Sequence, residues 1–374
     1  MSSCRASSSA AKPSNAAAPP CVALAGLVFG QLFSGWAACG RVFWGTLLAA
    51  SILTAFQAPA AAAEEPRKLR LGLLPIADTV LLHVAQRSGF FGAEGLEAEF
   101  VPFQSADEKN AAVMAGGLDG HFCEISAAIV QRAHGLPYVV AATTTHTDPA
   151  QRVFGLVVKP GSTAKSLADL RGASLAGASR TIIDFLTDVF LAQAGLPDDF
   201  VERRDIQKIP LRVQTLLAGQ LDGAVLPEPL LSVVEKAGGR VIVDDRTLNM
   251  PLAVVALRAD LADRATVEAF RRALARAVAQ VNSQPVQTRA LMLELGLIPP
   301  SLADWTPPRY NPATIPESLP GPAVYDAYVA WLVKNEVLGP PGAGGRLKPA
   351  PAYEDVVFGA AEAAAAGSPA GADE

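Results

Sequence analysis

The residues best suited to bind an anion are Ser179, Arg180 and Thr181. They stand between a short apolar run, Ser174–Ala178, and an amphipathic run, Ile182–Ala194, which predict a strand followed by a helix. The first amides of a helix have no intrahelical partner and attract negative charge. Two hydroxyl groups and a planar guanidinium beside those amides would suit a carboxylate, a sulfonate or nitrate. The alternative is an ordinary capped helix beside a solvated arginine.

A second candidate is the loop that follows the expected strand Leu69–Ile76 and opens a helix. Loops at the carboxyl ends of strands are where open α/β sheets bind their ligands, and backbone amides there can hold an anion. The residues concerned are Pro75, Ala77, Asp78 and Thr79. The alternative is that Asp78 or Thr79 only caps the helix.

Glu124 and Ser126 end another expected strand, His121–Ser126. A carboxylate buried at a strand end needs a partner, so Glu124 lies either in a cleft or at the surface. Ser126 either caps the next helix or donates a hydrogen bond to a ligand.

Glu228 is flanked by Pro227 and Pro229, which fix the backbone around it. We expect its carboxylate to point into a cleft or to latch a hinge. A ligand amine or Arg180 would be its natural partner. Direct contact of Glu228 with a ligand would make a purely anionic ligand less favourable.

Short β-type runs alternate with amphipathic helical runs from Lys68 onward, which is typical of an α/β fold with mostly parallel sheets. The nine expected strands are Leu69–Ile76, Ala98–Phe103, His121–Ser126, Tyr138–Thr145, Phe154–Lys159, Ser174–Ala178, Ala224–Leu226, Arg240–Asp244 and Leu252–Leu257.

One short motif occurs twice, as AGGLDG at residues 115–120 and AGQLDG at residues 218–223. Each copy closes a helical run and opens an apolar one. Gly116 and Gly219 can take the left-handed conformation that ends a helix, and Leu118 and Leu221 can fill the space beneath. Matching contexts about a hundred residues apart indicate two similar lobes.

The chain resembles the type II periplasmic solute-binding proteins of ABC transporters, in the branch for nitrate, sulfonates, taurine and thiamine-pyrimidine precursors. The segments that carry the resemblance are LRLGLLPIADTVLLHVAQRSGFFGAEGLEAEF, AAVMAGGLDGHF, VVKPGSTAKSLADLRGASLA and LLAGQLDGAVLPEPLLSVVEKAGG. It implies a two-lobed fold with one lobe formed by residues 68–155 plus 249–338 and the other by residues 156–248. It also implies a ligand held between the lobes by hinge closure, and a membrane permease as partner. We expect a monomer that takes a small anionic or zwitterionic organic molecule.

The two ends of the chain differ in composition from this body. Residues 1–63 predict a signal peptide that is cleaved after Ala63 and directs the protein to the periplasm. Lipidation at Cys39 and a retained membrane anchor are the alternatives. We expect residues 299–323, rich in proline, to wrap the first lobe, and residues 339–374 to form a partly disordered tail.

Charge argues against nucleic acid as a partner. The chain has 31 basic and 36 acidic residues, and the predicted leader carries three of the basic ones, so the body has a net charge of −8. Half of all residues are hydrophobic and 18% are charged, as in a globular protein. Cys123 is the single cysteine of the body, in an expected core strand, which indicates a buried, inert thiol.

The sequence shows no pattern of a common catalytic or metal site. The four histidines lie on separate expected elements, and there is no P-loop, dinucleotide fingerprint or Gly-x-Ser-x-Gly motif. We therefore expect neither enzyme activity, nor a cofactor, nor a metal. Two alternatives share the expected fold, namely an enzyme of the thiamine-pyrimidine or menaquinone-pathway type and a ligand-binding sensor domain.

Overall fold

The computed structural model describes residues 65–342 and 344–361. The predicted leader, its cleavage point and Cys39 lie outside the described residues, as does the end of the predicted tail.

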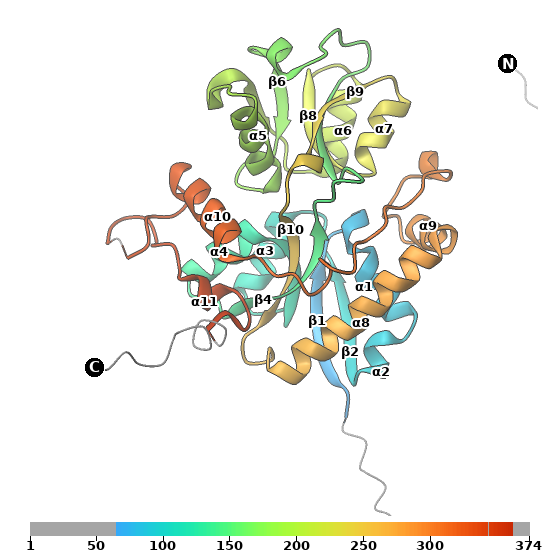
Figure 1. The fold of residues 1–374 in the computed structure, drawn as a ribbon, viewed down its shortest axis with the longest axis vertical. Coiled ribbons are helices and arrows are strands. Elements are labelled where there is room, and N and C mark those ends of the chain that lie inside the picture. The colour runs from blue at the N-terminus through green and yellow to red at the C-terminus, as the bar shows by residue number, and fades with distance from the viewer. Residues whose placement is uncertain (1–64, 343, 362–374) are drawn as a thin grey trace, which may run out of the picture. The chain divides into compact units, whose positions relative to one another are not determined.

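The first sheet has the strand order β2-β1-β3-β10-β4 (Figure 1). Its strands are β1 (Arg67–Leu73), β2 (Leu96–Pro102), β3 (Gly120–Glu124), β4 (Tyr138–His146) and β10 (Pro251–Arg258). β1 runs parallel to β2 and β3, whereas β10 runs antiparallel to β3 and β4.

The second sheet repeats this plan in the order β7-β6-β8-β5-β9. Its strands are β5 (Phe154–Val158), β6 (Ser174–Gly177), β7 (Glu202–Asp205), β8 (Gly223–Pro227) and β9 (Arg240–Asp244). β6 is parallel to β7 and β8, and β5 is antiparallel to β8 and β9.

The predicted α/β, two-lobed fold with mostly parallel sheets is confirmed, since four of the five strands in each sheet run in one direction and only β10 or β5 runs against them. β5 and β10 are the strands that enter a sheet directly from the other lobe. They arrive without the helical crossover that a parallel neighbour requires, and so they run against their neighbours.

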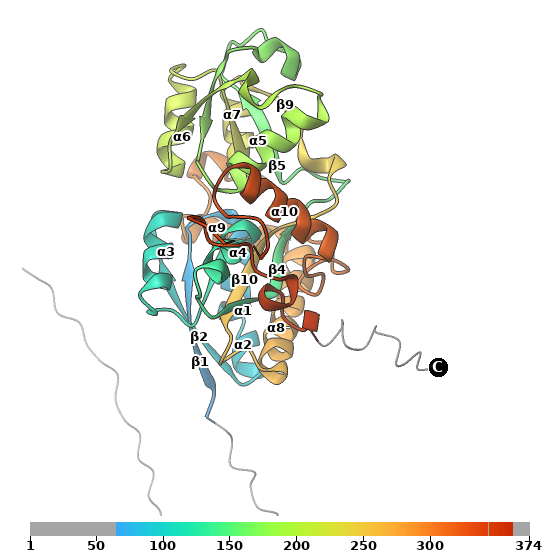
Figure 2. The same ribbon diagram turned by 90° about the vertical axis from the view of Figure 1, so that its left-hand side faces the viewer.

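Helices cover both faces of each sheet. They are α1 (Val80–Arg87), α2 (Phe90–Ala93), α3 (Ala106–Met114), α4 (Ile125–Ala133), α5 (Ile182–Gln193), α6 (Ile209–Leu217), α7 (Leu230–Lys236), α8 (Arg264–Ser283), α9 (Pro285–Glu294), α10 (Pro322–Lys334) and α11 (Tyr353–Val356). α1, α2 and α8 share one apolar cluster with the first sheet, and α4, α10 and α11 share another (Figures 1 and 2). Within the described residues, none of the helices combines the length and apolar character that a membrane span requires.

The two copies of the repeated motif adopt the same local structure in the two lobes. Gly116 and Gly219 have φ values of 70° and 73°, so both helices end in the left-handed conformation predicted for them. In each copy the aspartate then accepts an amide hydrogen bond from the neighbouring parallel strand. Asp119 Oδ2 lies 2.9 Å from the Arg70 nitrogen, and Asp222 Oδ2 lies 2.9 Å from the Ser174 nitrogen.

Two crossing segments, residues 147–153 and 245–250, join the lobes and hydrogen-bond to each other. Asp245 Oδ1 accepts from the Val153 amide at 2.9 Å, and Thr147 Oγ1 both donates to the Leu248 carbonyl and accepts from the Met250 amide. The hinge is therefore a paired strip of chain rather than two independent linkers.

Helix α10 makes a further connection, because it packs on α4 of the first lobe and also contacts α5 of the second. Phe185 of α5 stacks on Tyr328 with ring centroids 4.3 Å apart, and the Trp331 indole donates to Asp188 Oδ2 at 2.7 Å. The residues after α10 continue over the first lobe, where Val356 is fully buried, so the predicted tail includes a packed segment.

Candidate ligand-binding site

A cavity of about 690 Å³, its open mouth included, lies where loops of the two lobes meet. We call it the front cavity. Its walls are largely apolar, and its lining residues are Leu74, Ile76, Asp78, Ser105, Ala106, Phe122, Glu124, Phe154, Ala178, Thr181, Ile182, Ile183, Gln207, Ile209, Arg212, Pro227, Leu252 and Ala253.

Two carboxyl groups of the first lobe line the front cavity, and for Glu124 this is the cleft alternative of the two considered. Asp78 lies in the loop after β1, and Glu124 ends β3. Burial, followed by the nearby charges of Asp245 and Glu124, raises the pKa of Asp78 to about 7. Asp78 is therefore close to half-protonated at neutral pH.

Arg212 of α6 supplies a buried cation on the side of the second lobe. It is 3% exposed, and its Nε donates to the Ile206 carbonyl at 3.1 Å. Burial lowers the pKa of Arg212 to about 10, and the charges of Asp205 and Glu124 oppose that shift. The guanidinium stays charged at neutral pH. It had not been predicted as a site residue.

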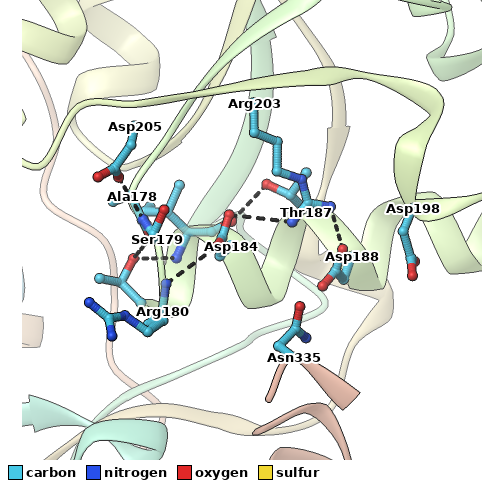
Figure 3. A network of polar contacts seen from close by, with 12 residues as sticks. Ala178, Ser179, Arg180, Asp184, Thr187, Asp188, Asp198, Arg203, Asp205 and Asn335 are labelled. Carbon is cyan, nitrogen blue, oxygen red and sulfur yellow. Dashed lines mark hydrogen bonds and ion pairs between the residues drawn. The ribbon is translucent and has the colours of Figure 1, made fainter. Parts of the chain in front are cut away.

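At the predicted anion site, residues 179–181, two of the backbone amides already have partners. The Ser179 amide donates to Asp205 Oδ1 at 2.8 Å and the Arg180 amide donates to Asp184 Oδ2 at 3.3 Å, so acidic side chains occupy the amides expected to hold a ligand. Figure 3 shows the Arg180 guanidinium turned away from these carboxylates. Neither Ser179 nor Arg180 lines the front cavity, and both are exposed.

Thr181 differs from these two neighbours because it does line the front cavity. Its hydroxyl donates to the Ala178 carbonyl at 2.6 Å and accepts from the Ile183 amide at 3.2 Å. Thr181 is the N-cap of α5, and a hydroxyl already committed in this way shapes the cavity wall.

Thr79 and Ser126 lie outside the front cavity. Thr79 is fully buried, and its hydroxyl donates to the Ile76 carbonyl at 2.8 Å, which closes the loop after β1. Ser126 is 1% exposed, and its hydroxyl has no hydrogen-bond partner among the described residues. Ser126 therefore neither caps α4 nor faces the cavity.

Glu228 pairs with the hinge rather than with Arg180. Its carboxylate accepts from Arg152 Nε at 2.7 Å and from Ser232 Oγ at 2.8 Å. Arg152 belongs to the first crossing segment and also pairs with Glu235. Glu228 thus contacts a crossing segment, and it also lines a second cavity beside that segment, so its contact with a ligand stays a prediction.

Pro75 and Ala77 line an apolar groove beside the front cavity, and Ala77 also lines a second cavity behind the loop. Their contact with a ligand stays a prediction.

Within residues 65–342 and 344–361, no group of three or more His, Cys, Asp or Glu side chains is arranged to hold a metal ion. Cys123 is 1% exposed in β3, and burial raises the pKa of its thiol to about 12. The predicted burial of this thiol is confirmed.

Residues 62–295 match the sequence pattern that characterises the NMT1-like family. No curated protein sequence matches the chain significantly. Many solved structures share its fold, and three illustrate the likeness.

The ligand-binding component of an ABC-type import system from Staphylococcus aureus, with zinc bound, has a TM-score of 0.59 at 17% identity, over 78% of this chain and 96% of that chain. The periplasmic aliphatic sulphonate binding protein SsuA from Escherichia coli has a TM-score of 0.61 at 19% identity, over 74% and 94%. The alkanesulfonate-binding protein SsuA from Xanthomonas axonopodis pv. citri, bound to MOPS, has a TM-score of 0.62 at 19% identity, over 77% and 98%. The predicted resemblance to type II periplasmic binding proteins is confirmed.

Proposed function

Because the chain belongs to the NMT1-like family, we propose that it is the extracytoplasmic solute-binding component of an ABC importer. Residues 1–63 would act as its signal peptide, with cleavage after Ala63, and the mature protein would work in the periplasm as a monomer. Its partners would be a small-molecule ligand and a membrane permease. The proposed role is binding without chemical conversion of the ligand.

The observation that carries this proposal is the composition of the front cavity. Buried Arg212 faces it from one lobe, Asp78 and Glu124 face it from the other, and the remaining wall is mostly apolar. A ligand that satisfies both kinds of charge is a zwitterion with an apolar body. A purely anionic ligand fits less well, because carboxylate groups on the wall opposite Arg212 would repel it.

Hinge closure is the proposed means of capture. The front cavity draws its walls from both lobes, so a ligand that contacts both favours the closed arrangement by the free energy of those contacts. Arg152 supports this motion from the hinge, because it links the crossing segment to Glu228 and Glu235 of the second lobe. A permease could then distinguish loaded from empty protein by the lobe arrangement.

The test is thermal unfolding of the purified full-length chain against a panel of amino acids, aminosulfonates, sulfonates, nitrate and simple carboxylates. A ligand at a hundred times its Kd stabilises the folded state by about 2.7 kcal/mol, which raises the Tm of a chain of this size by about 4 °C. Recovery of the shifting compound unaltered by mass spectrometry supports binding without catalysis. Consumption of the compound would contradict the proposal in favour of an enzyme.

A further inference from the structure

The irregular segment 303–321, which we call the strap, is fastened across the first lobe by side chains from several elements. The Asn282 amide donates to the Tyr310 carbonyl at 2.7 Å and accepts from the Tyr310 nitrogen at 2.8 Å. Gln151 of the first crossing segment holds the backbone of Arg309 in the same two-bonded way. Such pairing replaces the ladder bonds that an irregular segment lacks. The strap is thus a fixed wall.

Behind this wall lies a second cavity of about 590 Å³, its open mouth included, which we call the strap cavity. The loop after β1, the first crossing segment and the strap line it, and Trp305 and Tyr310 contribute its aromatic surface. Asp78 lines both this cavity and the front cavity. The two cavities therefore adjoin at one carboxyl group.

Most polar side chains of the strap cavity already have hydrogen-bond partners, but those of Thr145 and Asp78 have none among the described residues. Thr145 is 4% exposed and lines the cavity, and its hydroxyl has no hydrogen-bond partner among the described residues. Within the same residues, no group donates a hydrogen bond to the Asp78 carboxyl. A buried hydroxyl left in this state destabilises the protein until a partner arrives, and the partly exposed Asp78 carboxyl is free to accept a hydrogen bond.

His146 adds an acceptor whose tautomer is fixed by its neighbour. Its Nδ1 lies 2.7 Å from the Thr147 carbonyl, which can only accept a hydrogen bond. Nδ1 therefore carries the hydrogen in the neutral ring, and Nε2 keeps its lone pair. His146 lines the strap cavity.

Two arginines also line the strap cavity, but neither prevents a cationic ligand group from binding there. Arg152 is already paired with Glu228 and Glu235, and the Arg309 side chain is exposed, where solvent screens its charge. The unpaired groups at hand are a carboxyl, a hydroxyl and an imidazole nitrogen beside two aromatic rings. Hydrogen-bond acceptors and aromatic faces together favour an organic cation.

We infer that the strap cavity receives the nitrogen-bearing end of a ligand whose acid group lies at Arg212 in the front cavity. This rests on the proposed function and narrows its ligand class. The ligand is an ω-amino acid, carboxylic or sulfonic, in which an apolar spacer separates the two charges. Asp78 and Thr145 bind the ammonium group, and the apolar front walls contact the spacer.

The test is calorimetric titration of the full-length chain with ω-aminocarboxylates from 3-aminopropanoate to 8-aminooctanoate. Straight-chain carboxylates of the same lengths, which lack the nitrogen, form the matched series. Affinity should pass through an optimum along the amino series, and at that optimum the amino acid should bind at least 10-fold more tightly than its matched carboxylate.

A pair of adjacent variants then locates the ammonium group. Thr144 and Thr145 both carry buried hydroxyl groups without a partner in the described part of the chain, but only Thr145 lines the strap cavity. Thr145→Val should weaken the best amino acid about 10-fold and leave the carboxylates unchanged. Thr144→Val should change neither.

The outcomes separate this inference from the proposed function. Equal binding of both series, or equal effects of Thr145→Val and Thr144→Val, overturns the role of the strap cavity while solute binding stands. The strap role is also overturned if neither series binds but another member of the ligand panel does. If the folded protein binds no compound of either kind or of the panel, both proposals fail.

Discussion

Replacement of Arg212 by methionine should make the empty protein more stable and its ligand binding much weaker. Methionine matches the length and apolar stem of arginine but carries no charge. The guanidinium is 3% exposed and has no carboxylate within ion-pair distance among the described residues, so its burial costs free energy that no direct partner offsets. In the proposed function, the acid group of the ligand supplies the missing partner.

The pKa of Arg212 gives the size of this effect. Burial lowers it from 12.5 to about 10, which corresponds to about 3 kcal/mol against the charged form. Because the folded-state pKa lies below the unfolded one, the penalty acts throughout the pH range below about 10 and is relieved only above it. The variant also loses the hydrogen bond to the Ile206 carbonyl, which lowers its stability by about 1 kcal/mol. The net gain of about 2 kcal/mol raises the Tm by about 3 °C.

Ligand affinity should move in the opposite direction. Truncation of one partner of a buried charge pair costs about 2–5 kcal/mol, which is roughly a 30- to 1,000-fold weaker Kd for the ligand found in the panel. Calorimetric titration measures the affinity, and differential scanning calorimetry measures the stability.

Arg180→Met is the matched control, since Arg180 is exposed and lies outside the front cavity. It should leave both the Tm and the Kd within error. The reasoning is refuted if Arg180→Met weakens binding as much as Arg212→Met does, or if Arg212→Met lowers the Tm of the empty protein.

Three further predictions follow from single contacts. Trp331→Phe removes the 2.7 Å bond to Asp188 and part of a buried ring, so the free energy of unfolding in urea should fall by about 2–4 kcal/mol; no measurable fall would contradict the bridging role of α10. Asp78 has a folded-state pKa of about 7, above its unfolded value of 3.8, so wild-type stability falls as pH rises between these values. The free energy of unfolding of Asp78→Asn should therefore equal that of the wild type at pH 3 and exceed it by up to about 4 kcal/mol at pH 8. Parallel profiles of stability against pH for the two proteins would refute this. Glu228→Gln should lower stability by about 1–3 kcal/mol through its weakened pairing with Arg152, as denaturant titration would show, and an unchanged midpoint would count against the hinge latch.

The framework of the fold could be predicted from the sequence because its strands are apolar and its turns are marked. All nine expected strands occur, and the two copies of the repeated motif end their helices as expected. The strand that was missed, β7, has the sequence Glu-Arg-Arg-Asp and lies at the exposed edge of its sheet. Edge strands have no buried face to impose an apolar pattern.

The candidate site was predicted less well, since partners distant in sequence decide what a polar group does. Ser179 and Arg180 had free amides in the sequence interpretation, but Asp205, 26 residues away from Ser179, occupies one of them. The sequence does contain one indication that Arg212 is buried. It lies four residues before buried Leu216 and so shares the buried face of α6. A charged residue at such a position is a candidate for a cavity.

The contacts of α10 have a consequence for how this protein can vary among its relatives. Phe185 of one lobe packs on Tyr328 and Trp331 of a helix seated on the other, with ring centroids 4.3 and 5.6 Å apart. Tight packing of this kind tolerates a change of volume at one position only when a neighbour compensates. Substitutions at positions 185, 328 and 331 should therefore occur together in evolution, and relatives that lose the aromatic ring at 185 should carry larger side chains opposite it.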